Sequence, residues 1–425
     1  MRRWPIVWFI AAAPFCCAQD PFDRVLQLSR IRHKMADALN RMPDYTCLVT
    51  IEREVQTPKD RGFKPVDTIR FEIAHAGDRE LWAWPGATSF QDTPMTSMIP
   101  NGAFGIGDFA LHARNIFVGG YSNMRFAGPV KLDGRPALRW DYDIPTFGSG
   151  WRIVFGQRAA VAGMSGSFWV DSESLDVLRL DMHAENLPSD FPMTSAVNTI
   201  HYARTKTGAS FVQLPQSAVL LIRHDTGELR RNTTEFSHCR QYAGQSSISF
   251  DAKLPSSAGA METPKIQEVE LPAGLRVRIK LTSAIESSKA AVGDLVEGIV
   301  ESDVSQNGNL FVPKGAAVTG RIRRVEKQNE GPYFTVGIEI DDIAYPEHHA
   351  RFFGSLMALD PEPPGFEWFL GGERTEVVTQ QDRVAIAGKR SVRPQDLPGV
   401  GTFFLRGSSF RIRAGTVLVW ETRSL

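Results

Sequence analysis

Apolar and polar residues alternate along most of this chain, and such alternation predicts short β-strands that are buried on one side. The clearest example lies between residues 163 and 187, where two such segments, 167–171 and 177–182, flank a polar turn. The segments are too close in sequence for a crossover helix, so we expect them to pair as an antiparallel hairpin. Similar segments on both sides of the hairpin predict one large antiparallel sheet.

Two stretches follow the period of a helix instead. In residues 22–42, apolar side chains recur every three or four positions, which predicts an amphipathic helix. These side chains are Val25, Leu28, Ile31, Met35, Leu39 and Met42. Asp108 is expected to be the N-cap of a second, short helix over residues 109–117. The predicted fold class is therefore mainly β, of the α+β kind.

The length of 425 residues predicts two or three domains. Residues 251–268 are rich in Pro, Ser and Gly and have no apolar period, which is typical of a linker. We therefore expect one domain over residues 19–250 and another over residues 269–425.

The first eighteen residues are typical of a signal peptide. Arg2 and Arg3 precede a short apolar core, and small residues precede Gln19. The core is shorter than the roughly 20 residues that a membrane-spanning helix needs, and no later segment is apolar enough to span a bilayer. Acylation of Cys16 or Cys17, as in a lipoprotein, is the alternative. Both interpretations predict export, to the periplasm, the outer membrane or the medium.

The cysteine and charge content give further information about the compartment and the class of protein. Cys47 and Cys239 are the two cysteines that remain after cleavage, and an oxidising compartment makes them a candidate disulfide. Two unrelated buried thiols are the alternative. The 48 basic and 48 acidic residues cancel, which argues against a nucleic-acid-binding protein.

Residues 19–250 resemble the LolA/LolB type of outer-membrane lipoprotein-carrier fold. The likeness consists of the leading amphipathic helix, the antiparallel meander, the inserted short helix, and residues 166–171 (Gly-Ser-Phe-Trp-Val-Asp) followed by 178–180 (Leu-Arg-Leu). It implies an antiparallel half-barrel with covering helices, lined by apolar residues that hold acyl chains.

Residues 269–425 are similar to the small β-barrel of TrbI-like conjugative-transfer proteins. The matching pieces are residues 271–274 (Leu-Pro-Ala-Gly), 292–294 (Val-Gly-Asp) and 310–315 (Leu-Phe-Val-Pro-Lys-Gly). The resemblance implies a C-terminal small β-barrel, which we interpret as a docking module for a partner protein of the envelope.

The sequence predicts no catalytic residue, metal ligand or cofactor. His348 and His349 are adjacent, so they are expected to point to opposite faces of a strand, as a solvated pair. Ser165 stands in a sequence close to a nucleophile elbow, but it precedes a strand rather than a helix. Glu339 and Asp341 are expected on one wet strand face, without the spacing of a calcium loop. We therefore expect a protein that is not an enzyme.

The remaining candidates for a site are aromatic and apolar. If a half-barrel of this size is not filled by its own side chains, a groove closed by residues 109–117 is left for an acyl chain or another apolar ligand. The candidate lining residues are Trp82, Trp84, Phe109, Ile116, Phe117, Trp140 and Trp169. If these side chains fill an ordinary core instead, the chain is a structural or assembly protein of the envelope. A hydrolase is a third interpretation.

Overall fold

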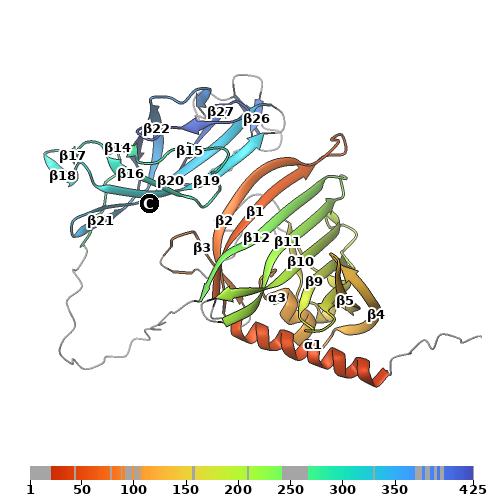
Figure 1. The fold of residues 1–425 in the computed structure, drawn as a ribbon. Coiled ribbons are helices and arrows are strands. Elements are labelled where there is room, and N and C mark those ends of the chain that lie inside the picture. The colour runs from red at the N-terminus through yellow and green to blue at the C-terminus, as the bar shows by residue number, and fades with distance from the viewer. Residues whose placement is uncertain are drawn as a thin grey trace, which may run out of the picture.

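The computed structural model describes most of the chain after the first twenty residues. The described residues are 21–42, 45–76, 79–87, 89–90, 98–99, 105, 107–155, 158–207, 210–241, 267–328, 331–368, 376–378, 383–386, 390–392 and 397–424. They are mostly β-structure, as predicted (Figure 1). The expected signal peptide and residues 251–266 of the expected linker lie outside them.

The first half of the chain forms one antiparallel sheet of ten strands. These strands are β1 (Tyr45–Gln56), β2 (Lys64–Ala76), β3 (Arg79–Ala83), β4 (Asn123–Leu132), β5 (Arg135–Ile144), β8 (Gly163–Asp171), β9 (Val177–Glu185), β10 (Met193–Thr207), β11 (Ser210–His224) and β12 (Leu229–Gln241). Their order is β3-β2-β1-β12-β11-β10-β9-β8-β5-β4. The predicted hairpin is confirmed, because β8 pairs antiparallel with β9. A separate hairpin pairs β6 (Arg152–Phe155) with β7 (Arg158–Val161).

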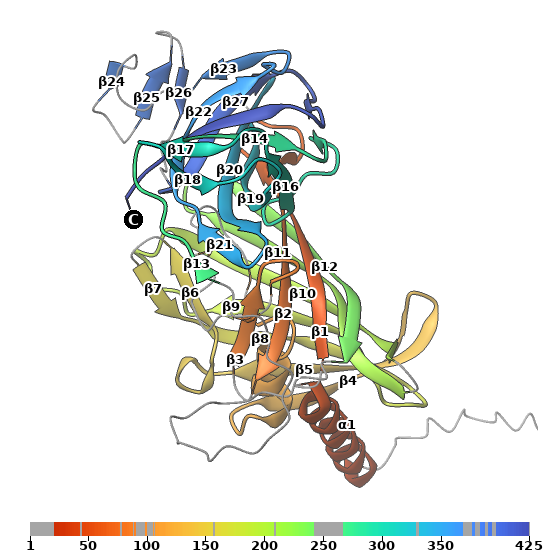
Figure 2. The same cartoon turned by 90° about the vertical axis from the view of Figure 1, so that its left-hand side faces the viewer.

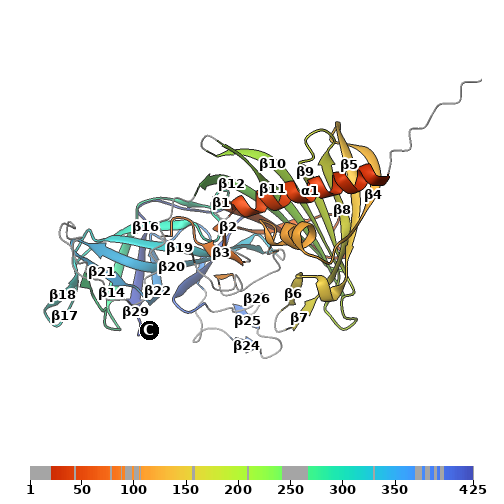
Figure 3. The ribbon, with the colours of Figure 1, turned by 90° about the horizontal axis from the view of Figure 1, so that it is seen from below.

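The ten-stranded sheet curls into a half-barrel, and α1 (Pro21–Arg41) runs across it (Figure 3). The predicted apolar face of α1 is buried in the core of the sheet at Ile31, Met35 and Leu39. The start of the same helix is different, because Val25 is 67% exposed. Among the described residues, no helix is long and apolar enough to cross a membrane.

The second predicted helix is shorter than expected and changes type. A single α-turn, α3 (Leu111–Ala113), continues directly as the π-helix η2 (Arg114–Val118). The prediction that Asp108 is the N-cap was wrong. The N-cap residue is Ala110, and no side chain makes a capping hydrogen bond at this position. Asp108 is buried and accepts a hydrogen bond from Asn198 instead.

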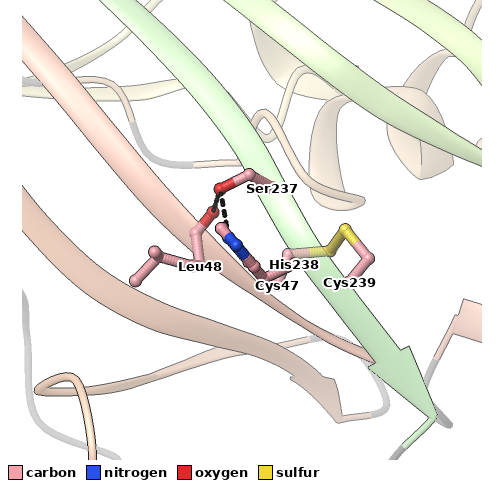
Figure 4. Close-up of a disulfide and its surroundings, with 5 residues drawn as sticks. All are labelled: Cys47, Leu48, Ser237, His238 and Cys239. Atoms are coloured by element: carbon pink, nitrogen blue, oxygen red, sulfur yellow. Dashed lines mark hydrogen bonds between the residues drawn. A yellow bond between two sulfur atoms is a disulfide. The ribbon is translucent and has the colours of Figure 1, made fainter.

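The predicted disulfide between Cys47 and Cys239 is confirmed (Figure 4). The two residues lie on β1 and β12, which are neighbours in the sheet. The pairing shifts at this point by a bulge between Thr46 and Leu48, and His238 takes a positive φ of 48° opposite it. The bond closes a loop with a sequence separation of 192 residues.

The second half of the chain forms another sheet with its own hydrophobic core. Its strands are β13 (Gln267–Glu268), β14 (Arg276–Leu281), β16 (Leu295–Val300), β19 (Ala317–Gln328), β20 (Tyr333–Tyr345), β21 (His348–Arg351), β22 (Gly354–Asp360), β23 (Phe366–Trp368), β27 (Val400–Arg406) and β29 (Val417–Thr422). The order is β13-β21-β20-β19-β16-β14-β29-β22, and β27 pairs with β20 and β23. Residues 267 and 268, the end of the expected linker, thus belong to a strand.

Three small sheets complete the described part of the second half. Among them, β17 (Val304–Gln306) and β18 (Asn309–Val312) form a two-stranded hairpin. The other small sheets are β15 (Ile285–Glu286) with β28 (Arg411–Ile412), which are distant in sequence, and the three-stranded sheet of β24 (Glu376–Val378), β25 (Arg383–Ile386) and β26 (Arg390–Val392).

The two sheets touch where a turn of the second half meets β2 (Figure 2). Ile69 and Val292 form a parallel bridge, in which the Arg70 amide donates to the Val292 carbonyl at 2.8 Å. The Arg70 guanidinium also pairs with Asp294 at 2.7 Å. Gly293 has a φ of +100°, and a Cβ on it would lie 2.2 Å from the Arg70 carbonyl oxygen. Only glycine allows this approach.

Candidate functional site

A cavity of about 590 Å³ opens beside α3 and η2. This volume lies within the range of roughly 300–1,000 Å³ that is usual for small-molecule sites. The side chains that line it belong to Leu111, His112, Arg114, Asn115, Val118, Trp151 and Arg152, and Gly107, Gly119 and Gly150 complete the wall. These residues come from α3, from η2, from the backbone next to these helices and from the segment that leads into β6.

Exposed apolar side chains belong to the cavity wall or lie close to its residues in sequence. Val118 is 44% exposed, although it is the last residue of η2. Tyr121 and Phe147 are 58% and 81% exposed and meet edge to face, with ring centroids 5.5 Å apart. They lie two and three residues from Gly119 and Gly150 of the cavity wall. A cluster of exposed apolar side chains beside a cavity is typical of a ligand or interaction site.

The wall element α3–η2 is held at its start by Glu80 of β3. The Glu80 carboxylate accepts hydrogen bonds from the backbone N–H of Gly107 at 2.9 Å and of Ala110 at 3.0 Å. Gly107 has a φ of +104°, and a Cβ on it would lie 2.9 Å from His112 Nε2. A glycine at this position therefore lets the chain turn tightly into the wall element.

The end of the wall element is held by α1. Arg32 Nε donates to the Phe117 carbonyl at 2.9 Å, and an Arg32 Nη donates to the Gly119 carbonyl at 3.3 Å. Ser122 Oγ donates to the Ile116 carbonyl. These bonds satisfy carbonyls that the end of a helix leaves without partners. One residue of α1 thereby fixes the rim of the cavity.

Two buried carboxyl groups lie near the start of the wall element. Burial raises the pKa of Glu80 to about 7, against the lowering effect of its backbone hydrogen bonds. Burial also raises the pKa of Asp108 to about 6, although Asn198 Nδ2 donates to it at 2.6 Å. His112 Nε2 is 3.8 Å from Asp108 Oδ1. Burial raises the pKa of Tyr202 as well, and both carboxyl groups add to this effect.

Four of the predicted groove residues lie in the core of the half-barrel. Phe109, Ile116, Phe117 and Trp140 are each at most 3% exposed. Phe117 meets Phe168 edge to face with centroids 4.9 Å apart. The structure thus brings these residues together in a packed cluster, and the large cavity lies on the other side of the wall element.

The three remaining tryptophans are dispersed. Trp82 packs edge to face on Phe71 and borders a void of only about 10 Å³, which is room for about one water molecule. Trp84 lies under the guanidinium of Arg323, 5.4 Å away, at the contact between the two sheets.

Trp169 lies apart from both of them. Its ring is between the guanidinium groups of Arg139 and Arg179, at 5.7 and 4.9 Å. Of the seven predicted groove residues, none lines the large cavity.

The other side chains considered for chemistry all have structural partners. Ser165 Oγ donates to Glu185 at 2.6 Å. Asp341 lies 3.5 Å from the guanidinium of Arg321, and Asp342 accepts from His349 at 3.0 Å. Among the described residues, no group of three or more His, Cys, Asp or Glu side chains is placed to hold a metal ion.

Comparisons with known proteins return structural likenesses only. No protein-family model matches the sequence, and no curated protein matches it significantly. A DUF1329 family protein from Desulfovibrio piger is 12% identical, over 54% of this chain and 96% of its own, with a TM-score of 0.31. A structure described as an outer membrane lipoprotein-sorting protein domain, from Vibrio parahaemolyticus, is 12% identical over 52% of this chain and 95% of its own, with a TM-score of 0.28.

A third structure, the MucA/MucB complex of Pseudomonas aeruginosa, is 12% identical over 74% of this chain and 90% of its own, with a TM-score of 0.15. A lipoprotein-sorting domain is thus among the structures that this chain resembles. The TrbI-like resemblance of the second half stays a prediction.

The cavity combines an apolar wall with a cationic edge. Leu111, Val118 and Trp151 offer apolar surface, while Arg114 and Arg152 offer positive charge. Such an arrangement can bind a molecule that has an apolar part and an anionic part. Sequence patterns did not reveal these residues as a site, because α3, η2 and the start of β6 contribute them and only the tertiary structure brings these segments together.

Proposed function

We propose that this chain is an exported protein of the cell envelope that binds an apolar or amphiphilic ligand non-covalently, without a chemical step. The ligand occupies the cavity beside α3 and η2. The observation that carries the proposal is this cavity of about 590 Å³, with apolar side chains of Leu111, Val118 and Trp151 in its wall. Burial of apolar surface there supplies about 25 cal/mol per Å².

This place differs from the groove that the sequence suggested. The interior of the half-barrel holds Phe109, Phe117 and Trp140 in its packed core. The ligand therefore binds on the outer side of the wall element, where Val118 is exposed. An acyl chain of a lipid or a lipoprotein is the type of ligand that such a surface accepts.

Export and partner docking belong to the same proposal. The disulfide between Cys47 and Cys239 supports an oxidising compartment such as the periplasm. We propose that the second half of the chain docks to a partner protein of the envelope. Leu295 and Ile299 support that role, because both are exposed on one face of β16.

The proposal is tested by mass spectrometry of the protein after gentle purification from an exporting host. Co-purified acyl species at a stoichiometry near one are expected for the wild type. Leu111→Trp places a bulky ring in the cavity and is expected to remove them. Leu310→Trp is the matched control, because Leu310 is 58% exposed in the other half of the chain. Equal amounts of bound lipid in both variants would contradict the proposed place of binding.

A structural or assembly protein is the second candidate. It is favoured by the dense packing of the predicted groove residues, of which Ile116 is completely buried. In that case the purified wild type carries no acyl species and does not bind apolar probes, and its partners are proteins of the envelope.

A further inference from the structure

Two polar atoms of the cavity wall have no hydrogen-bond partner. They are Arg114 Nε and Asn115 Oδ1, both buried within η2, and both residues line the cavity. Buried polar atoms nearly always find a partner, because a buried group without a hydrogen bond loses its interaction with water and gains nothing in return. A buried donor and a buried acceptor without partners, on two residues that line the same cavity, point to a ligand that completes them.

Arg114 and Asn115 are the first two residues of the π-helix η2. The N–H of Gly119 donates to the Arg114 carbonyl at 3.0 Å, which is the five-residue step of a π-helix. Short π-helices occur mostly as single turns and frequently at functional sites. This one is fixed by Glu80 before it and by Arg32 after it.

The charge of the lining favours an anion. Arg114 and Arg152 both line the cavity, and none of its described lining residues is acidic. A guanidinium group presents Nε and Nη in a fork that matches a carboxylate or a phosphate. Leu111, Val118 and Trp151 provide the apolar part of the same wall.

We infer that the cavity selects single-chain amphiphiles with an anionic headgroup and a hydrogen-bond donor next to the charge. The anion pairs with Arg114, the donor is accepted by Asn115 Oδ1, and the chain lies against Val118 and Trp151. An acylated amino acid has this chemistry through its carboxylate and amide N–H, and a lysophosphatidic acid has it through its phosphate and hydroxyl. The inference rests on the proposed function and adds the class of ligand.

The test compares ligands that differ by one group. N-dodecanoylglycine has both the charge and the N–H, N-dodecanoylsarcosine lacks the N–H, and N-dodecanoylglycinamide lacks the charge. Their affinities for the full-length mature protein are measured by calorimetry below the critical micelle concentrations. We expect the first ligand to bind about tenfold more tightly than either of the others, because each of the others lacks one of the two polar interactions.

Two variants test whether Arg114 recognises the charge of the ligand and Asn115 its N–H group. Arg114→Met keeps the stem and is expected to remove the preference for the charged ligand. Asn115→Leu is expected to remove the preference for the N–H. 1-Dodecanoylglycerol 3-phosphate identifies the source: binding tighter than that of N-dodecanoylglycine, with the same dependence on both residues, supports the inference with a lipid phosphate as the anion.

Two results overturn the inference in different ways. Equal affinity of the wild type for the three acyl compounds would refute the headgroup site and leave apolar binding intact. No binding of any of them would refute the proposed function together with the inference. The wild-type comparison decides both points even if a variant fails to fold.

Discussion

Arg32 and Phe117 are 85 residues apart in sequence, and Arg32 Nε donates a hydrogen bond of 2.9 Å to the Phe117 carbonyl. The bond joins the first helix of the chain to the end of the wall element. It explains how a short π-helix, with few backbone bonds of its own, keeps a defined shape beside a cavity. The shape of the cavity therefore depends on a residue that does not line it.

Replacement of Arg32 tests this dependence. Arg32→Met removes the bonds to the carbonyls of Phe117 and Gly119 and is expected to lower the free energy of unfolding by about 1–3 kcal/mol. It is also expected to weaken ligand binding. Urea unfolding and calorimetry measure the two effects. Arg30→Met is the control, because Arg30 is exposed on the same helix. Unchanged binding in Arg32→Met would show that the wall element holds its shape without α1.

The buried carboxyl group of Glu80 predicts a dependence of stability on pH. Its folded pKa of about 7 lies above the ordinary value of 4.5. The stability that its protonated form contributes is therefore complete below pH 4.5 and is lost as the pH rises through 7. Asp108 acts in the same direction, with a folded pKa of about 6.

Glu80→Gln removes this titration. Between pH 5 and pH 8, the wild type is expected to lose on the order of 2 kcal/mol more stability than the variant. Urea unfolding at several pH values provides the measurement. Glu297→Gln, at an exposed position of β16, should behave as the wild type. Parallel pH profiles for the wild type and Glu80→Gln would mean that Glu80 ionises normally in the folded protein.

Removal of the disulfide tests the link between β1 and β12. The variant with both Cys47→Ser and Cys239→Ser is expected to lose up to about 5 kcal/mol, because a loop of 192 residues is no longer closed in the unfolded chain. Thermal unfolding with and without reductant measures the loss. In the oxidised wild type, thiol reagents should find no free Cys47 or Cys239. Rapid labelling of either residue would contradict the bond.

Replacement of Gly293 tests whether the two sheets are joined at this turn. Gly293→Ala places a methyl group against the Arg70 carbonyl and strains a positive φ, so the contact with β2 should open. Small-angle scattering is expected to show a larger radius of gyration. Gly62→Ala is the control, because nothing lies within 4 Å of a Cβ at that position. Identical scattering from wild type and Gly293→Ala would contradict a join at this turn.

Periodic patterns predicted the strands and the first helix well. The alternation around Trp169 predicted the β8–β9 pair, and the Asn307-Gly308 turn joins β17 to β18 as its sequence suggests, with φ of 54° and 80°. The disulfide followed from cysteine count and compartment. These features depend on local sequence or on simple pairing rules, so one chain is enough to find them.

The site could not be predicted in the same way. Aromatic side chains such as Phe117 and Trp140 look the same in sequence whether they fill a core or line a groove. Glu80 is buried because it caps a segment that follows 27 residues later, and no local pattern records that contact. The cavity arises where η2 meets the turn before β6, which only the tertiary structure brings together.

Displacement of a bound fluorescent probe shows whether the cavity beside η2 holds an apolar ligand. With 1-anilinonaphthalene as the probe and N-dodecanoylglycine as the competitor, we expect one site in the wild type and in Leu310→Trp, and none in Leu111→Trp. Undiminished probe binding and displacement in Leu111→Trp would mean that the ligand does not bind in this cavity.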